Sequence, residues 1–158
     1  MKLSKFQWAI VLGVLAVAFI AVFDIWSMNS GVFGTAQDYV NGNYANGWWS
    51  LIFKLNLMII ILIPITYFIF YRRDKSEAAA LFLVPFGLWF AGLADILFFV
   101  FQGLTIPARL PWLDSHIIIG RISSLLGFSG VTNISLFLSI IIISIALYFI
   151  VKILKNKL

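Results

Sequence analysis

Residues 48–75 read WWSLIFKLNLMIIILIPITYFIFYRRDK, and this stretch decides the class of the fold. From Trp48 to Tyr71, 14 residues are Leu, Ile or Phe. A helix of that length, at ~1.5 Å per residue, crosses a hydrocarbon core of ~30 Å. Each large apolar residue favours insertion by roughly 0.3–0.6 kcal/mol, and together they outweigh the roughly 2.5–3.5 kcal/mol cost of Lys54. The stretch therefore predicts a transmembrane helix followed by a basic loop.

Three further apolar segments of similar length accompany it. The chain has 158 residues, of which 63% are hydrophobic and 11% charged, and its mean hydropathy is +1.06. Such a composition is typical of membrane proteins and allows one domain. The first segment follows Lys2 and Lys5 as a signal peptide would, but it is longer and lacks a small-x-small cleavage site, so we predict a retained helix. We predict one all-α domain, 1–158, an integral membrane four-helix bundle with spans about 6–28, 48–71, 77–102 and 131–153.

The basic residues predict how the bundle is oriented. Cytoplasmic loops are enriched in Lys and Arg. With the N-terminus inside, eight of the eleven fall on the cytoplasmic side, and only Arg109 and Arg121 fall outside. We therefore predict cytoplasmic N- and C-termini and outer loops at about 29–47 and 103–130. Because the charges lie at the ends of apolar segments and form no stripe, nucleic acid is not an expected partner of this chain, whose formal net charge is +5.

The second outer loop contains a candidate interfacial helix. Asp114 is a residue type that caps helices, and Gly127 is one that ends them. At about a dozen residues, 114–126 is too short to span the bilayer. We predict a short amphipathic helix at the outer interface, between the third and fourth spans. Its expected apolar face comprises Ile118, Ile119, Ile122, Leu125 and Leu126, and its polar face His116, Gly120, Ser123 and Ser124.

Three charged residues lie within the predicted spans, all in the outer half. Counting ~1.5 Å per residue, Asp24 lies ~6 Å deep, Lys54 ~9 Å and Asp95 ~10 Å. Gly87, Ala91 and Asp95 recur every fourth residue, which predicts that Asp95 faces a closely packed neighbouring helix. Pro85 is expected to kink the helix that carries Asp95. Lys54 has three interpretations: an ion pair with Asp95 or Asp24, a side chain extended to the headgroups, or a catalytic or binding lysine. The inner halves of the spans carry almost nothing polar.

These residues and the neighbouring loop define a candidate ligand-binding site. Its members are Asp95, Lys54, Asp24, Gln102, Arg109, Asp114 and His116. A lone histidine among scattered acids does not predict a metal ion, although His116 and Asp95 would be the candidate ligands if one were bound. No motif specifies catalysis or a cofactor, and the absence of cysteine excludes disulfides and thiolate metal sites.

Three functions remain open. The first is a membrane protein whose outer-leaflet polar site binds or processes a lipophilic ligand or lipid. The second is an accessory or scaffold subunit whose charges pair within the bundle or with partner helices. The third is a component of an oligomeric transporter, against which the apolar inner half argues. Membrane lipids are expected partners in each case, together with further copies of the chain or a larger membrane complex.

Overall fold

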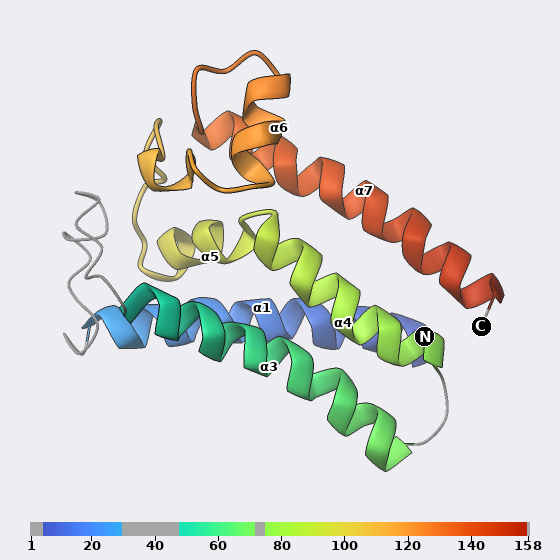
Figure 1. The fold of residues 1–158 in the computed structure, drawn as a ribbon. Coiled ribbons are helices and arrows are strands. Elements are labelled where there is room, and N and C mark those ends of the chain that lie inside the picture. Colours follow the sequence, from blue (N-terminus) through green and yellow to red (C-terminus); the bar gives the residue numbers. More distant parts are fainter. Residues whose placement is uncertain (1–4, 30–47, 72–74, 158) are drawn as a thin grey trace.

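The computed structural model describes residues 5–29, 48–71 and 75–157, which form helices joined by turns and loops (Figure 1). Its helices are α1 (Lys5–Asn29), α3 (Trp48–Tyr71), α4 (Lys75–Phe90), α5 (Leu93–Phe101), the short 3₁₀ helix η1 (Pro111–Leu113), α6 (Ile119–Leu125) and α7 (Asn133–Lys157). Among these residues the only β-type pairing is one isolated bridge between Arg109 and Thr132. The all-helical prediction is confirmed. The predicted outer loop 29–47 lies outside the described residues, except for Asn29.

Two of the helices, α1 and α7, are long and apolar enough to cross a membrane. Their candidate spans are Ile10–Ser27 and Asn133–Lys155. The bent pair α4 and α5 adds a third crossing if it is taken as one span. In α3 the apolar stretch Lys54–Phe70 is shorter. Two to three helices are therefore long and apolar enough to span a membrane, which indicates membrane association, and the complete bundle of four spans stays a prediction.

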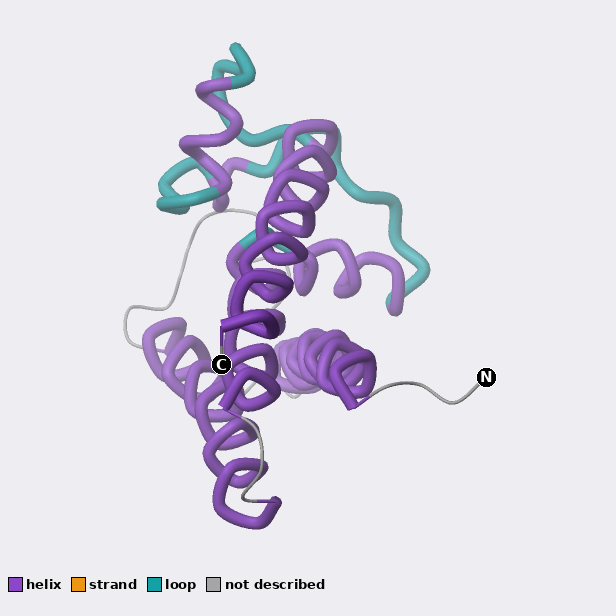
Figure 2. The backbone as a smooth tube through the Cα atoms, turned by 90° about the vertical axis from the view of Figure 1, so that its right-hand side faces the viewer, coloured by secondary structure: helices purple, strands orange, loops and turns teal. Residues whose placement is uncertain are grey.

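Helix α4 lies at the centre of the fold and packs against α1, α3 and α7. Small residues allow the close approach that helix association in a membrane requires. A Cβ atom added at Gly13 of α1 would lie 3.0 Å from a methyl carbon of Val84 on α4. The start of α1, the end of α3, the start of α4 and the end of α7 lie at one end of the molecule (Figure 1). In the turned view most of the loops gather at the top, around the start of α7 (Figure 2).

The segment predicted as one helix, 77–102, is broken into α4 and α5, which meet at 69°. The break is not at Pro85, where the sequence predicts a kink, because α4 continues through that residue to Phe90. It falls at Gly92, which has a φ of +91°. Proline removes one backbone donor, which a helix tolerates, whereas the left-handed conformation that ends a helix favours glycine. Gly92 therefore decides where the chain turns.

The predicted interfacial helix 114–126 is shorter than expected. Only Ile119–Leu125 is α-helical, and η1 and a turn precede it. The predicted end at Gly127 is confirmed: its φ is +83°, its N–H donates to the Ser124 carbonyl, and the Phe128 N–H donates to the Ser123 carbonyl. The predicted division into an apolar and a polar face stays a prediction. Ser123 is fully buried and Leu125 is 86% exposed, because Ser123 turns inward to hydrogen-bond with the start of α7.

The end of the fold where α3 ends and α4 begins, which was predicted to face the cytoplasm, is less apolar than the sequence suggests. Glu77, in the first turn of α4, is buried, and the Tyr67 hydroxyl of α3 donates a hydrogen bond to its Oε2. Ser76 is buried beside it. A buried carboxyl needs a hydrogen-bond partner, and here the partner is a tyrosine already positioned by the neighbouring helix. The expectation of an inner half with almost no polar groups is therefore corrected at this end of α4.

Candidate functional site

Helices α1 and α3 bring Asp24 and Asn56 together. The Asn56 Nδ2 donates a hydrogen bond of 3.2 Å to Asp24 Oδ1. Asn56 is 2% exposed, and its Oδ1 is buried without a partner among the described residues. Nearby, the Ser27 hydroxyl donates to the Asp24 backbone carbonyl at 2.8 Å, as is common for serine within a helix. Asp24 therefore faces a neutral amide from the neighbouring helix.

The predicted ion pair of Lys54 does not form within the described part of the chain. Lys54 is exposed. The ion pair found among the described residues joins Arg109 and Asp114 instead. Residues two apart on a helix point roughly 200° away from each other, so turning Asn56 toward α1 turns Lys54 away. The interpretation in which the Lys54 side chain extends toward the headgroups fits this arrangement. The partner of Asp24 is Asn56, which the sequence analysis missed. The sequence signal for this was the spacing of Asn56 and Lys54, because residues two apart on a helix cannot both face α1.

The second carboxyl group, that of Asp95, reaches the same region from α5. Asp95 lies in the first turn of α5, where the helix dipole favours an acid. The Trp112 Nε1 of η1 donates a long hydrogen bond of 3.4 Å to Asp95 Oδ1. Helix α5 packs against α1, the helix that carries Asp24. Asp24, Asn56, Asp95 and Trp112, from four separate segments, form what we call the outer polar site.

The small residues Gly87 and Ala91 do not pack in the way that the four-residue spacing with Asp95 predicted. Because the helix breaks at Gly92, Gly87 and Ala91 do not share one continuous helix face with Asp95. Gly87 instead receives Leu147 of α7, since a Cβ atom there would lie 2.8 Å from a Leu147 methyl carbon. The small residues thus fit α4 to α7, and the bend turns Asp95 toward α1 and η1.

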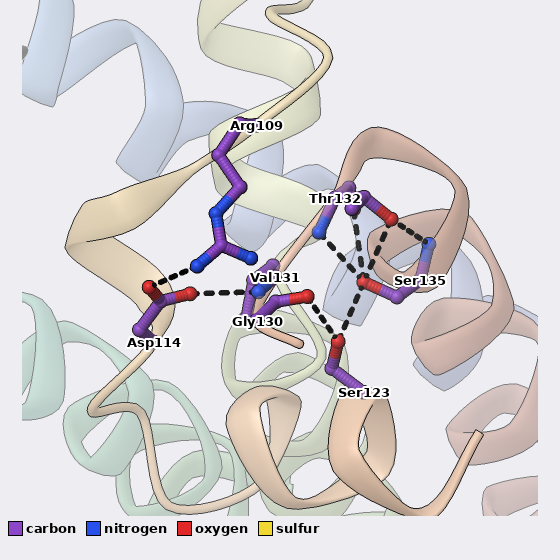
Figure 3. Close-up of polar contacts among 7 residues, drawn as sticks. All are labelled: Arg109, Asp114, Ser123, Gly130, Val131, Thr132 and Ser135. Atoms are coloured by element: carbon purple, nitrogen blue, oxygen red, sulfur yellow. Dashed lines mark hydrogen bonds and ion pairs between the residues drawn. The ribbon is translucent and has the colours of Figure 1, made fainter. Parts of the chain in front are cut away.

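Arg109 and Asp114 form a separate polar cluster that ties the outer loop to α7 (Figure 3). The Arg109 Nη2 and Asp114 Oδ2 form an ion pair of 2.7 Å, and Asp114 Oδ1 accepts the Val131 N–H at 2.7 Å. Asp114 does not cap α6, contrary to the prediction: the residue at the cap position is Ile118, whose side chain forms no capping hydrogen bond. The Leu110 N–H donates to the Val131 carbonyl at 2.9 Å, next to the isolated bridge. We call this group the loop clamp.

Three hydroxyl groups extend the loop clamp to the start of α7. The Thr132 Oγ1 accepts the Ser135 N–H at 3.1 Å, and the Ser135 Oγ accepts the Thr132 N–H at 2.8 Å. This reciprocal pair is a capping box with serine in place of the usual acid. The buried Ser123 hydroxyl lies 3.1 Å from the Ser135 hydroxyl and donates to the Gly130 carbonyl at 2.7 Å (Figure 3). The Thr-x-x-Ser spacing was the sequence signal for this cap.

The remaining candidates, Gln102 and His116, lie apart from this network. Gln102 ends α5, and its Nε2 is buried without a partner among the described residues. The His116 ring lies 5.5 Å from the Phe90 ring, and its Nδ1 accepts the Ile119 N–H at 3.4 Å. His116 forms no hydrogen bond or ion pair with the acids in the described ranges. Those ranges contain no group of three or more His, Asp or Glu side chains arranged to hold a metal.

The environment of His116 leads to a pH prediction. Burial lowers the pKa of His116 below its usual 6.5, so the unfolded chain binds this proton more readily than the folded one. The contribution of neutral His116 to stability is therefore complete above pH 6.5 and is lost as the pH falls through the lowered folded pKa. Protonation also removes Nδ1 as the acceptor for Ile119. We expect the unfolding temperature in detergent to fall more steeply from pH ~7.5 to ~5 in the wild type than in His116→Gln.

The comparison of the two slopes controls for the acids, which titrate in both proteins. Equal slopes in the wild type and in His116→Gln would contradict the prediction, because they would assign the whole acid sensitivity to other groups.

No protein family model, curated protein or solved structure matches this chain. The functional argument therefore rests on the geometry of the outer polar site and the loop clamp.

Proposed function

We propose that the chain crosses the membrane four times with both termini in the cytoplasm. The proposal has two supports. The ends of α1, α3, α4 and α7 that carry the predicted cytoplasmic charges lie at one end of the molecule (Figure 1). Large apolar side chains are exposed on α1, α3 and α7, a surface typical of contact with lipid. They include Leu15, Phe19, Ile65, Ile69, Ile141 and Phe149.

The absence of cysteine makes this topology directly testable. Single cysteines at Lys75 and Lys155 should react with a membrane-impermeant thiol reagent only after the cells are opened. A cysteine at Ser115, in the outer loop, should react in intact cells. All three parent residues are exposed, and Lys155 also lies near the end of α7. Labelling of Lys75→Cys in intact cells would contradict the proposed orientation.

The function that the geometry supports best is binding of a lipophilic ligand or lipid at the outer polar site. The observation that carries this proposal is the contact of Asp24 with Asn56 between α1 and α3, beside Asp95 on α5, a helix that packs against α1. Ionisable groups at membrane depth are costly and usually mark a functional site. Asp24 and Asp95 are both partly exposed, so a ligand can approach them from the surface. Asp24 and Asp95 already accept hydrogen bonds from Asn56 and Trp112, and we propose binding.

The test is to identify what copurifies with the protein in mild detergent. We expect lipid extracts of the wild type to contain a species that is depleted in Asp24→Asn and Asp95→Asn. Asp114→Asn is the matched control, because it makes the same chemical change in the loop clamp. If both site variants fold and retain every copurified species at wild-type amounts, binding at the outer polar site is excluded.

A second candidate, an accessory or scaffold subunit, is favoured by one specific observation. Along α1, large exposed apolar residues recur at alternating spacings of four and three, which is the pattern of a helix–helix seam. They are Trp8, Leu12, Leu15, Phe19, Val22 and Trp26. A partner helix seated on this seam would be retained in mild detergent. Purification of a monomer, with nothing crosslinked to a photoreactive residue at Leu15 in native membranes, would exclude the scaffold role.

A further inference from the structure

The short helix α6 presents two large apolar side chains to its surroundings, one on either side of an arginine. Ile117 is 71% exposed and Leu125 is 86% exposed, and Arg121 between them is exposed as well. Backbone hydrogen bonds with four-residue spacing begin at the His116 carbonyl, before α6, and end at the Leu126 N–H, after it. Residues four apart on a helix share a face. Ile117, Arg121 and Leu125 therefore form one stripe, which we call the α6 face.

Helix α6 lies at the depth of one end of a candidate membrane span. It packs against the start of α7 (Figure 1). Its Ser123 hydroxyl lies 3.1 Å from the Ser135 hydroxyl, and its Ile119 packs in one apolar cluster with Leu136. Ser135 and Leu136 belong to the candidate span Asn133–Lys155. At ~1.5 Å per residue these contacts lie ~3–5 Å into that span, where a bilayer passes from headgroups to acyl chains.

The α6 face points away from these contacts. Ile117 and Arg121 each lie two residues from the buried Ile119, and Leu125 lies two residues from the buried Ser123. Side chains two residues apart on a helix point roughly 200° away from each other. Whatever surrounds this end of α7 therefore meets the α6 face.

The chemistry of the α6 face fits a lipid surface better than a protein partner. An interfacial helix places apolar side chains among acyl chains and basic side chains near anionic headgroups. Among the described residues the ion pair joins Arg109 and Asp114, so the Arg121 guanidinium pairs with no described acid. A stable protein interface buries ~1,000 Å² or more, which three side chains of a short helix cannot provide.

Resting on the proposed membrane crossing, we propose that the α6 face binds the outer leaflet, with Arg121 on the phosphate of an anionic phospholipid and Ile117 and Leu125 among the acyl chains. A guanidinium binds phosphate through two parallel hydrogen bonds. A choline or ethanolamine headgroup carries a cation that already compensates its own phosphate, whereas a glycerol headgroup carries none. The contact is separate from the outer polar site and does not depend on whether that site binds a ligand.

The test places one fluorophore on the full chain and measures which quenchers reach it. The chain has no cysteine, so Leu125→Cys, Leu15→Cys and Ser115→Cys each take a single label. The protein would be reconstituted in phosphatidylcholine vesicles with a minority of phosphatidylglycerol, and one of the two lipids would carry a nitroxide on its acyl chain. We expect nitroxide lipids to quench the labels at Leu125 and at Leu15, which is exposed on α1, and aqueous iodide to quench the label at Ser115.

The label at Leu125 also measures the role of Arg121. At equal lipid fractions, we expect nitroxide phosphatidylglycerol to be enriched at this label about five-fold over nitroxide phosphatidylcholine. That factor corresponds to the ~1 kcal/mol that one basic residue contributes at an anionic surface. Arg121→Gln should remove the preference. Lys75→Gln, which removes a positive charge at the other end of the fold, should preserve it.

The outcomes distinguish this inference from the proposed membrane crossing. Quenching of the Leu125 label by iodide alone, with lipid quenching at Leu15, would place the α6 face in water and overturn the inference while the crossing stands. A Leu125 label shielded from both quenchers would show a protein on this face, which also contradicts the inference. If the Leu15 label were not quenched by lipid either, the crossing would fail as well. If Arg121→Gln did not fold, equal quenching by the two lipids in the chain that retains Arg121 would still exclude the phosphate contact.

Discussion

Replacing Gly92 by alanine is expected to destabilise the fold by about 2–5 kcal/mol. A non-glycine residue in the left-handed conformation costs ~1–2 kcal/mol, and forcing an extra carbon into a packed interface costs typically ~1–3 kcal/mol. Both terms apply here, because Gly92 has a φ of +91° and an added Cβ atom would lie 2.3 Å from Leu136 Cδ1 and 3.0 Å from Ile119 Cδ1. The measurement is thermal unfolding in detergent, followed by intrinsic Trp fluorescence.

Gly103→Ala is the matched control for this substitution. Gly103 also has a positive φ, +64°, but an alanine Cβ atom there would meet nothing within 4 Å. It should therefore cost only the backbone term of ~1–2 kcal/mol. If the two variants lost equal stability, the contact between Gly92 and Leu136 would make no contribution, and the bend between α4 and α5 would be a local backbone feature independent of α7.

Asp114→Ala is the second substitution with a large expected effect, a loss of about 2–3 kcal/mol. Val131 is fully buried, and its N–H donates to Asp114 Oδ1 at 2.7 Å, so alanine leaves that donor without its partner. Hydrogen bonds to charged groups contribute about 1.5–3 kcal/mol. Because Val131 precedes the cap of α7, we also expect faster hydrogen exchange at the first turns of that helix. Unfolding in detergent and exchange mass spectrometry would measure the two effects.

Two control variants separate the contacts of Asp114. Arg109→Ala removes the ion pair alone, and since both side chains are largely exposed, at 42% and 37%, we expect a loss of no more than ~1 kcal/mol. Gly130→Ala should reproduce that small effect, because its Cβ atom would occupy the place of the guanidinium, at 1.9 Å from both terminal nitrogens. A loss in Arg109→Ala as large as in Asp114→Ala would show that the ion pair, and not the Val131 hydrogen bond, holds the loop.

The acidic residues of the outer polar site could be predicted from the sequence, and the residues that hydrogen-bond with them could not. Asp24 and Asp95 stand out in the sequence because a carboxyl group in an apolar segment is costly wherever the helix lies. Their partners depend on how each helix is rotated about its axis. Lys54 and Asn56 are two residues apart on α3, and only the packing of α3 against its neighbours decides which of them meets Asp24. One interpretation of the sequence paired Asp24 with Lys54 because of its charge, and the structure has the neutral amide of Asn56 there.

Local signals predicted helix ends better than they predicted helix faces. Gly127 ends α6 as expected, since a positive φ is a property of that residue and its immediate neighbours. The burial of Ser123 could not be read from a local pattern, because it depends on Ser135, twelve residues away. The same limit explains Asp114, whose N–H partner, Val131, lies seventeen residues further along the chain.

The sequence by itself determined that this chain is helical and has segments long and apolar enough to cross a membrane, because apolar length and composition act through every residue of a segment and need no partner. It also determined which residues are too costly to be incidental: Asp24, Lys54 and Asp95. Only the tertiary structure decided that the third segment bends at Gly92, that Asn56 and Trp112 meet the two acids, and that Asp114 holds the outer loop to α7. These are contacts between side chains and helices far apart in the chain, and their geometry follows from packing that no local pattern encodes.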